Sequence, residues 1–192
     1  MEMSEFFDKY APTWDEGNSP FSPARKAVVF IADVSGKNVL DIACGTGVMF
    51  PEYLEAGAKS ITGVDLSPEM VRIAREKVSD YENIEVICED VLALENDLFD
   101  TVVLYNGYPH FLYKESLVKK VSELLVPGGR FTVAHGMSRD ALNRHHDGLP
   151  ANICTDLLPA VEEAKIWHKY FKVDSIIDTD NFYLISGRKA VN

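Results

Sequence analysis

A short apolar segment that runs directly into a glycine-rich turn constrains the fold of this chain more than any other feature. Residues 38–43 are mostly apolar, and Cys44-Gly45-Thr46-Gly47 follows them at once. An apolar run of this length, bounded by turn residues, is typical of a strand that is buried on both faces. Such strands belong to parallel sheets, whose crossover connections place helices over the sheet. The sequence therefore predicts an α/β fold.

The same cycle of strand and helix repeats along the chain. We expect further strands at 60–66, 84–88, 99–105 and 130–135, and helices at 48–56, from 23, from 68, around 117–125 and at 159–170. Ser22 and Ser67 each precede a proline, and this pattern predicts two helix N-termini. Segments 173–177 and 182–186 are separated only by a short polar turn. Because that turn is too short for a crossover, these two strands are predicted to form an antiparallel hairpin.

The expected architecture is a Rossmann-like, mostly parallel sheet of seven strands with a terminal antiparallel hairpin and helices on both faces. Six of the strands are expected to run parallel and one antiparallel. A length of 192 residues fits a single domain, 1–192. The stretch 137–155 is polar and rich in His, Arg, Asn and Asp, and we interpret it as a lid or insertion, not as a linker.

Charge and cysteine content narrow the expected partners and setting. The formal net charge is −11, which repels phosphate backbones and disfavours a nucleic acid as substrate. Cys44, Cys88 and Cys154 form neither a disulfide framework nor a CxxC metal motif. No secretory signal and no apolar run of the ~20 residues that span a bilayer are found. We therefore expect a cytoplasmic protein without a membrane or nucleic-acid partner.

The glycine turn predicts a site for an elongated ligand beyond the carboxyl end of the first strand. A dinucleotide fingerprint requires a third glycine three residues after the second, and Phe50 occupies that position. Acidic residues also end three consecutive strands, at Asp41, at Asp65 and at Glu89-Asp90. Carboxylates at one sheet edge suit a ligand that carries positive charge and ribose hydroxyls.

Five segments in this order resemble class I S-adenosylmethionine-dependent methyltransferases, especially the small single-domain enzymes that act on small molecules. The five segments that show the resemblance are VLDIACGTG at 39–47, GVDLS at 63–67, CEDV at 88–91, FDTVV at 99–103 and LVPGG at 125–129. The resemblance covers about 6–189, and the terminal hairpin is also a property of that fold. One glycine turn alone is a weak signal, whereas five ordered segments are a strong one.

The resemblance implies a cofactor site built from several segments. It assigns Asp41, Ala43, Cys44, Gly45 and Gly47 to the methionine part, Asp65 to the ribose hydroxyls, Leu66, Met70, Asp90 and Val91 to the adenine, and Asn106 to the methionine amine. Ala43 stands where the family has its first glycine. Other interpretations are that Asp65 caps a helix, that Asp90 is a surface turn acid, that Met70 belongs to the core, and that Cys44 merely fills the turn.

The amino end is aromatic and predicted to be helical, and we treat 1–34 as an N-terminal helical lid region. In similar methyltransferases this segment closes over the cofactor, so Tyr10 and Trp14 are expected to shield the sulfonium, because aromatic faces attract cations. The alternative is a helix that packs on the sheet edge.

His135, His110 and His146 are the candidate catalytic residues. His135 ends a strand at the carboxyl edge, His110 follows another, and His146 lies in the predicted lid. Three interpretations of the histidine-rich lid remain open: metal binding, acid–base work or binding of an anionic substrate, and a solvated loop. Because the spacing matches no zinc template, we predict no metal.

The resemblance thus implies transfer of a methyl group from S-adenosylmethionine to a small-molecule acceptor by in-line displacement, with S-adenosylhomocysteine as the product. The segment 105–111 lacks the paired prolines of nucleic-acid amino-methyltransferases. A non-catalytic cofactor-binding module and a nicotinamide-dependent oxidoreductase are the alternatives. The attacked atom (N, O, S or C) is left open, as is the choice between monomer and homodimer.

Overall fold

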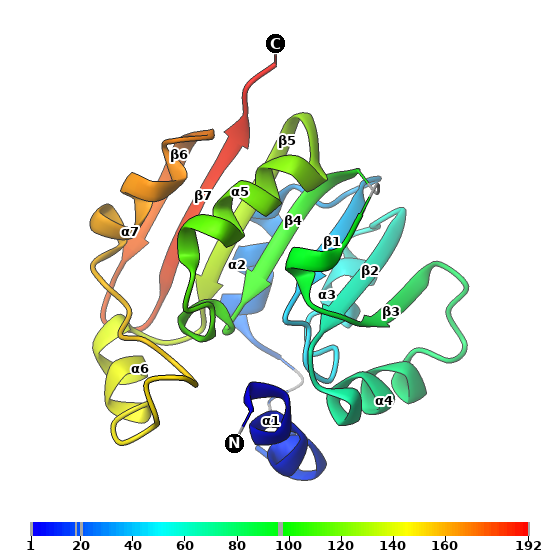
Figure 1. The fold of residues 1–192 in the computed structure, drawn as a ribbon. Coiled ribbons are helices and arrows are strands. Elements are labelled where there is room, and N and C mark those ends of the chain that lie inside the picture. The colour runs from blue at the N-terminus through cyan, green and yellow to red at the C-terminus, as the bar shows by residue number, and fades with distance from the viewer. Residues whose placement is uncertain (1, 18, 20, 96–97, 192) are drawn as a thin grey trace.

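The computed structural model describes residues 2–17, 19, 21–95 and 98–191, and it contains one seven-stranded sheet (Figure 1). Met1, Asn18 and Pro20 of the predicted lid region 1–34 lie outside the described residues. The strands are β1 (Asn38–Ile42), β2 (Ser60–Asp65), β3 (Ile84–Cys88), β4 (Phe99–Tyr105), β5 (Leu125–His135), β6 (Phe171–Asp178) and β7 (Tyr183–Lys189). The α-helices are α1 (Met3–Tyr10), α2 (Pro23–Ala32), α3 (Phe50–Glu55), α4 (Pro68–Lys77), α5 (Lys114–Leu124), α6 (Arg139–His145) and α7 (Ala160–Trp167).

The strand order is β3-β2-β1-β4-β5-β7-β6. Strands β1 to β5 pair in parallel, and β7 pairs antiparallel with both β5 and β6. The expectation of six parallel strands and one antiparallel strand is therefore confirmed. The strand order reverses next to β1, and in open α/β sheets the ligand crevice lies at such a reversal.

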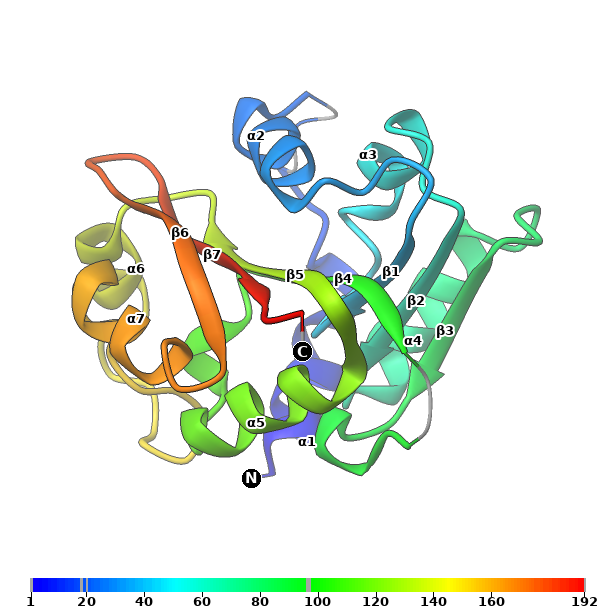
Figure 2. The same cartoon turned by 90° about the horizontal axis from the view of Figure 1, so that it is seen from above.

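Helices cover both faces of the sheet, as Figure 2 shows from above. Apolar side chains of α2, α3 and α4 form one buried cluster with residues of β1 and β2. Those of α5 and α7 form the other cluster, in which Trp167 stacks on Phe131 with ring centroids 4.0 Å apart. Burial of both faces explains why the central strands are continuous apolar runs.

Several predicted boundaries were wrong. Helix α3 begins at Phe50 and not at residue 48, because the turn continues through hydrogen bonds from Gly47 N to the Cys44 carbonyl and from Phe50 N to the Gly47 carbonyl. Strand β5 begins at Leu125, five residues before the predicted start at residue 130. The Pro-Gly-Gly segment 127–129, which was expected to end the preceding helix, lies inside this strand beside a register shift. Helix α7 spans Ala160–Trp167 and is shorter than the predicted 159–170.

The two predicted lid regions have more structure than the sequence suggested. Segment 137–155 contains α6, whose start is capped by the Ser138 hydroxyl, and Leu142 of this helix belongs to the core. In region 1–34, α2 packs on the sheet, whereas α1 and the following turn pack on α4 at the carboxyl edge (Figure 1). Because α2 packs on the sheet, the lid interpretation of 1–34 stays a prediction only for the segment before α2. Among the described residues, no helix has the length and apolar character to cross a membrane.

Candidate functional site

The glycine turn after β1 keeps a left-handed backbone at alternate positions. Ala43, Gly45 and Gly47 have φ angles of 53°, 53° and 80°. A Cβ on Gly47 would lie 2.5 Å from the Phe50 ring, which is almost fully buried. An aromatic ring thus fills the place where a dinucleotide fold brings helix and strand together through a glycine. This packing counts against the nicotinamide alternative.

Asp65 at the end of β2 connects the glycine turn to the start of α4. Its Oδ2 accepts a hydrogen bond from Gly45 N at 2.8 Å, and its Oδ1 accepts one from Ser67 N at 2.9 Å. Burial raises the pKa of Asp65, and these two backbone donors oppose that shift. The hydroxyl of Ser67 accepts from Met70 N at 3.1 Å and is the cap of α4. Asp65 is therefore not needed as the cap, which removes the first alternative for this residue.

Asp41 lies beneath the turn, with 2% of its surface exposed. Burial raises the pKa of its carboxyl to about 8, the Tyr53 hydroxyl opposes the shift, and the charge of Asp65 adds to it. Its Oδ2 is buried without a hydrogen-bond partner among the described residues. A cation bound next to this buried carboxyl would be stabilised by it, because a positive charge stabilises the ionised form of the carboxyl.

The residues expected around an adenine differ in exposure. Leu66 is 41% exposed, whereas Met70 and Val91 are buried. The Met70 sulfur lies 4.0 Å from the point that a Cβ on Gly45 would occupy, so this core residue also lies close to the turn. Asp90 accepts a hydrogen bond from Leu92 N at 2.9 Å and caps a short 3-10 turn. Asp90 therefore has the local role of a turn acid in addition to its place after β3.

Asn106 follows β4 with a φ angle of 59°. Its side-chain oxygen accepts a hydrogen bond from Gly136 N at 3.0 Å, and its own N–H donates to the Ala134 carbonyl at 2.9 Å. Asn106 thus joins the carboxyl ends of β4 and β5. A non-glycine residue in this conformation is uncommon and marks a position where the surrounding structure fixes the backbone.

The segment after α1 closes over the glycine turn. The Trp14 indole nitrogen lies 3.7 Å from the position of a Cβ on Gly45. Asp15 accepts hydrogen bonds from the Thr46 hydroxyl at 2.7 Å and from Lys77 at 2.6 Å, and Lys77 also donates to the Thr46 carbonyl. Trp14 therefore lies where a lid residue was expected. Tyr10 instead packs on Phe6, with ring centroids 5.0 Å apart.

A second anchor holds α1 itself. The Asp8 carboxylate accepts hydrogen bonds from the Ser67 hydroxyl at 2.5 Å and from Glu69 N at 3.1 Å, at the start of α4. Sequence reasoning missed Asp8, Asp15 and Lys77. Both aspartates lie in the aromatic segment predicted to be a lid, which is the one sequence feature that could have drawn attention to them. The neighbouring sequence does not indicate which residues they bind.

The three candidate catalytic histidines lie near one another at the carboxyl ends of β4 and β5. The rings of His110 and His146 have centroids 5.1 Å apart, and Phe7 of α1 lies edge-on to His110 at 4.9 Å. His135 is fully buried and faces Tyr183, with a centroid separation of 5.9 Å. Phe7 also contacts Trp14 at 5.8 Å. We call the series Trp14, Phe7, His110 and His146 the aromatic row, and it connects the glycine turn with the 137–155 segment.

These histidines are held neutral. Burial lowers the pKa of His110 to about 4 and that of His135 to about 3. Burial and the nearby charge of His145 lower the pKa of His146. Neither ring nitrogen of His135 has a hydrogen-bond partner among the described residues. The set therefore offers uncharged imidazoles, not cations, to a bound molecule. Within the described parts of the chain, no group of three or more His, Cys, Asp or Glu residues could hold a metal ion.

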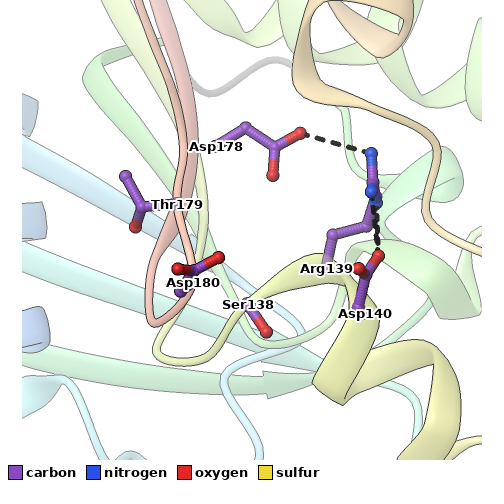
Figure 3. A pocket seen from close by; sticks show the side chains of 6 residues that line it. All are labelled: Ser138, Arg139, Asp140, Asp178, Thr179 and Asp180. Atoms are coloured by element: carbon purple, nitrogen blue, oxygen red, sulfur yellow. Dashed lines mark hydrogen bonds and ion pairs between the residues drawn. The ribbon is translucent and has the colours of Figure 1, made fainter.

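A separate surface pocket of about 320 Å³ lies between α6 and the β6–β7 turn (Figure 3). Its lining residues are Ser138, Arg139, Asp140, Asp178, Thr179 and Asp180. Arg139 pairs with Asp140 at 2.8 Å and with Asp178 at 3.6 Å, and Asp178 also accepts from Ala160 N at the start of α7. Through these contacts Asp178 joins the β6–β7 hairpin to α6 and to the start of α7.

Comparison with known proteins shows what the chain is similar to. A family model described as a methyltransferase domain matches residues 39–129, which include the glycine turn, Asp65, Asp90 and Asn106. The solved structure of the N-methyltransferase NodS from Bradyrhizobium japonicum, in complex with S-adenosylhomocysteine, aligns with a TM-score of 0.74. The alignment covers 98% of this chain and 99% of that one at 14% identity, so it establishes the fold.

Two curated relatives match in sequence. A ubiquinone biosynthesis O-methyltransferase of Ralstonia nicotianae is 30% identical over 146 residues, which are 68% of this chain and 60% of that protein. A ubiquinone/menaquinone biosynthesis C-methyltransferase, UbiE, of Geotalea daltonii is 33% identical over 149 residues, which are 69% of this chain and 62% of that protein. The chain spans about three fifths of the length of these relatives.

The fold is the Rossmann-like α/β fold of S-adenosylmethionine-dependent methyltransferases. Over residues 39–129 the chain matches a methyltransferase domain, and it is similar to class I S-adenosylmethionine-dependent methyltransferases.

Proposed function

We propose that the protein transfers a methyl group from S-adenosylmethionine to a small-molecule acceptor by in-line displacement. The single observation that carries the proposal is the glycine turn between two carboxyl groups, Asp41 and Asp65, with Trp14 above Gly45. The cofactor supplies a methyl group on a positively charged sulfur. The names of the two curated relatives, an O-methyltransferase and a C-methyltransferase, support this class of reaction.

The chemistry of the residues fits the cofactor. Both oxygens of Asp65 accept backbone N–H bonds, and each carboxylate oxygen has a second lone pair that can accept from a ribose hydroxyl. The buried Asp41 gains from a cation beside it. Leu66, Met70, Asp90 and Val91 would hold the adenine, Asn106 the methionine amine, and Ala43, Cys44, Gly45 and Gly47 the methionine part. Trp14 would shield the sulfonium, whereas Tyr10 would act only through its packing on Phe6.

On the acceptor side the protein supplies alignment and a site from which water is excluded. Positioning of two reactants contributes up to roughly 7–11 kcal/mol in favourable cases. His110, His135 and His146 would act on the acceptor as neutral acid–base groups. The net charge of −11 supports a small molecule in preference to a nucleic acid. The three free cysteines support a reducing, cytoplasmic setting.

Calorimetric titration with S-adenosylhomocysteine tests the proposal. We expect saturable binding to the wild type, and at least about tenfold weaker binding to Asp65→Ala, which corresponds to ~1.4 kcal/mol. The matched control is Asp140→Ala, which removes an exposed carboxylate beside Arg139. Absence of binding to folded wild type would reject the proposal. Binding without turnover of any acceptor would favour the non-catalytic module.

A further inference from the structure

We propose that the acceptor is a neutral compound with an aromatic hydroxyl group, and that Nε2 of His110 removes the hydroxyl proton as the methyl group is transferred. This inference rests on the proposed function and deepens it, because it names the acceptor class and the atom that accepts the methyl group.

The hydrogen bond of His110 fixes which nitrogen carries the proton. Its Nδ1 lies 2.9 Å from the carbonyl oxygen of Ile153. A carbonyl oxygen only accepts hydrogen bonds, so Nδ1 is the donor and carries hydrogen. In the neutral ring Nε2 then bears the lone pair, and among the described residues no hydrogen bond occupies it. His110 is therefore oriented as a base by a backbone carbonyl.

The segment that supplies this carbonyl is attached to the same turn at a second point. Thr155 N donates to the Pro109 carbonyl at 2.9 Å, next to His110 in sequence. Ile153 is fully buried, and its own N–H donates to the Pro150 carbonyl at 2.8 Å. The chain at 150–155 thus holds the imidazole in place through main-chain atoms. This arrangement explains why His110, at the end of the short 3-10 helix Tyr108–His110, can have a defined orientation.

The aromatic row places the base near the cofactor turn. Phe7 lies edge-on to His110 at 4.9 Å and contacts Trp14 at 5.8 Å, and Trp14 covers Gly45. The ring of His146 also lies next to His110, with centroids 5.1 Å apart. A molecule that reaches Nε2 from the turn therefore meets rings, which favour a flat aromatic acceptor.

The charges around the row favour a neutral acceptor. The titratable groups that face these histidines are Lys114 on α5, His135 on β5, and His145, His146 and Asp156 around the 137–155 segment. Lys114 pairs with the buried Glu163 at 2.5 Å, and Arg139 of α6 pairs with two carboxylates. The histidines remain uncharged because burial lowers the pKa of each of them. Lys114, Arg139 and the row therefore offer no uncompensated positive charge to a carboxylate or phosphate.

The step conserves atoms and charge. The hydroxyl oxygen forms the new O–CH₃ bond, the S–CH₃ bond breaks with its electron pair returning to sulfur, and the O–H proton passes to Nε2 of His110. Positive charge therefore moves from sulfur to the imidazole, and the net charge of the site does not change. Burial then favours release of that proton to solvent.

A pair of acceptors that differ in ionisation tests the role of His110. The probes are catechol, which is neutral at the assay pH, and 4-nitrocatechol, which is largely ionised. His110→Asn keeps an N–H near the position of Nδ1 but removes the base. We expect kcat/KM for catechol to fall by about 10²–10⁴-fold, and that for 4-nitrocatechol to fall by less than about tenfold. His168→Asn, at an exposed histidine after α7, is the matched control.

Two further measurements separate a loss of the base from a loss of folding or of cofactor binding. Binding of S-adenosylhomocysteine to His110→Asn should weaken by less than about threefold, because Asp8 and Asp15 still hold the amino-terminal segment. With wild type at saturating S-adenosylmethionine, kcat/KM for catechol should decrease only well below pH 6.5, as expected for a base whose pKa lies near 4. Equal loss for both catechols, or an acid limb at or above pH 6.5, would overturn the role of His110. Cofactor binding without turnover of either catechol would overturn the acceptor class, whereas no cofactor binding would overturn the proposed function itself.

Discussion

A Cβ on Gly107 would lie 2.9 Å from the Cβ of Ala43. The two residues follow neighbouring strands, β1 and β4, and their backbones approach closely where the strand order reverses. Ala43 stands where the glycine turn of the similar methyltransferases has its first glycine. Its backbone is left-handed, with a φ angle of 53°. That conformation costs a residue with a Cβ roughly 1–2 kcal/mol. The presence of alanine at residue 43 therefore requires glycine at residue 107.

Gly107→Ala should displace the glycine turn and weaken binding of S-adenosylhomocysteine by at least about tenfold, with a loss of about 1–3 kcal/mol in the free energy of unfolding. Ala43→Gly removes both the opposing Cβ and the strain, so the double variant should recover most of both losses. Calorimetry and urea unfolding measure the two quantities. Strictly additive effects would show that the two residues do not interact.

Asp15→Asn should weaken binding of S-adenosylhomocysteine about threefold to tenfold, mainly through faster dissociation, because Asp15 holds the segment that carries Trp14 over the turn. The free energy of unfolding should change by less than about 1 kcal/mol, since the Asp15–Lys77 pair is roughly 40% exposed. Stopped-flow fluorescence measures the dissociation rate. Asp33→Asn, which removes a similarly exposed pair with Arg188, should leave that rate unchanged.

Binding of S-adenosylmethionine should release a proton from Asp41 below pH 8. The carboxyl of Asp41 has a pKa of about 8 in the protein without cofactor, so it is mostly protonated at neutral pH. A cation beside it lowers that pKa, and affinity therefore rises as the pH approaches 8. Calorimetry at pH 7 in two buffers of different ionisation enthalpy measures the released proton. Proton release that persists in Asp41→Asn would assign it to another group.

The free energy of unfolding should be greatest near pH 6.5. Between pH 4 and 6.5 the unfolded chain binds more protons at His110 and His135 than the folded chain does, so stability rises with pH. Between about pH 4 and 8 the folded chain binds more protons at Asp41, so stability falls with pH by up to about 1.4 kcal/mol per unit. Urea unfolding across this range measures both limbs. Asp41→Asn should flatten the upper limb and His135→Leu the lower one.

The parts of the fold that were predicted correctly are those with a local signal. Apolar runs marked the central strands, Ser22 and Ser67 were confirmed as caps, and the short turn before β7 fixed the direction of the last strand. His110 and His135 could be expected on the same side because His110 follows β4 and His135 ends β5, and these two strands are parallel neighbours. These inferences need only the periodicity of the sequence and the geometry of a sheet.

The parts that were missed depend on contacts between distant residues. The early start of β5 follows from its pairing with β4, which overrides the helix-ending appearance of the Pro-Gly-Gly segment. The partners of Asp8 and Asp15 lie 59 and 31 residues away, and no spacing rule predicts them. The tautomer of His110 depends on a carbonyl 43 residues further along the chain. Each of these features is fixed by tertiary packing and has no local pattern.

The two anchors of the amino-terminal segment have a kinetic consequence. Asp15 ties this segment to the glycine turn, Asp8 ties it to the start of α4, and Phe7 ties it to His110. If the segment opens as the predicted lid, one motion would uncover both the turn and the imidazole, and neither would be exposed alone. Binding and release of both the cofactor and the acceptor would then depend on the same movement. The steady-state rate would therefore be limited by the opening rate of this segment and not by the methyl-transfer step.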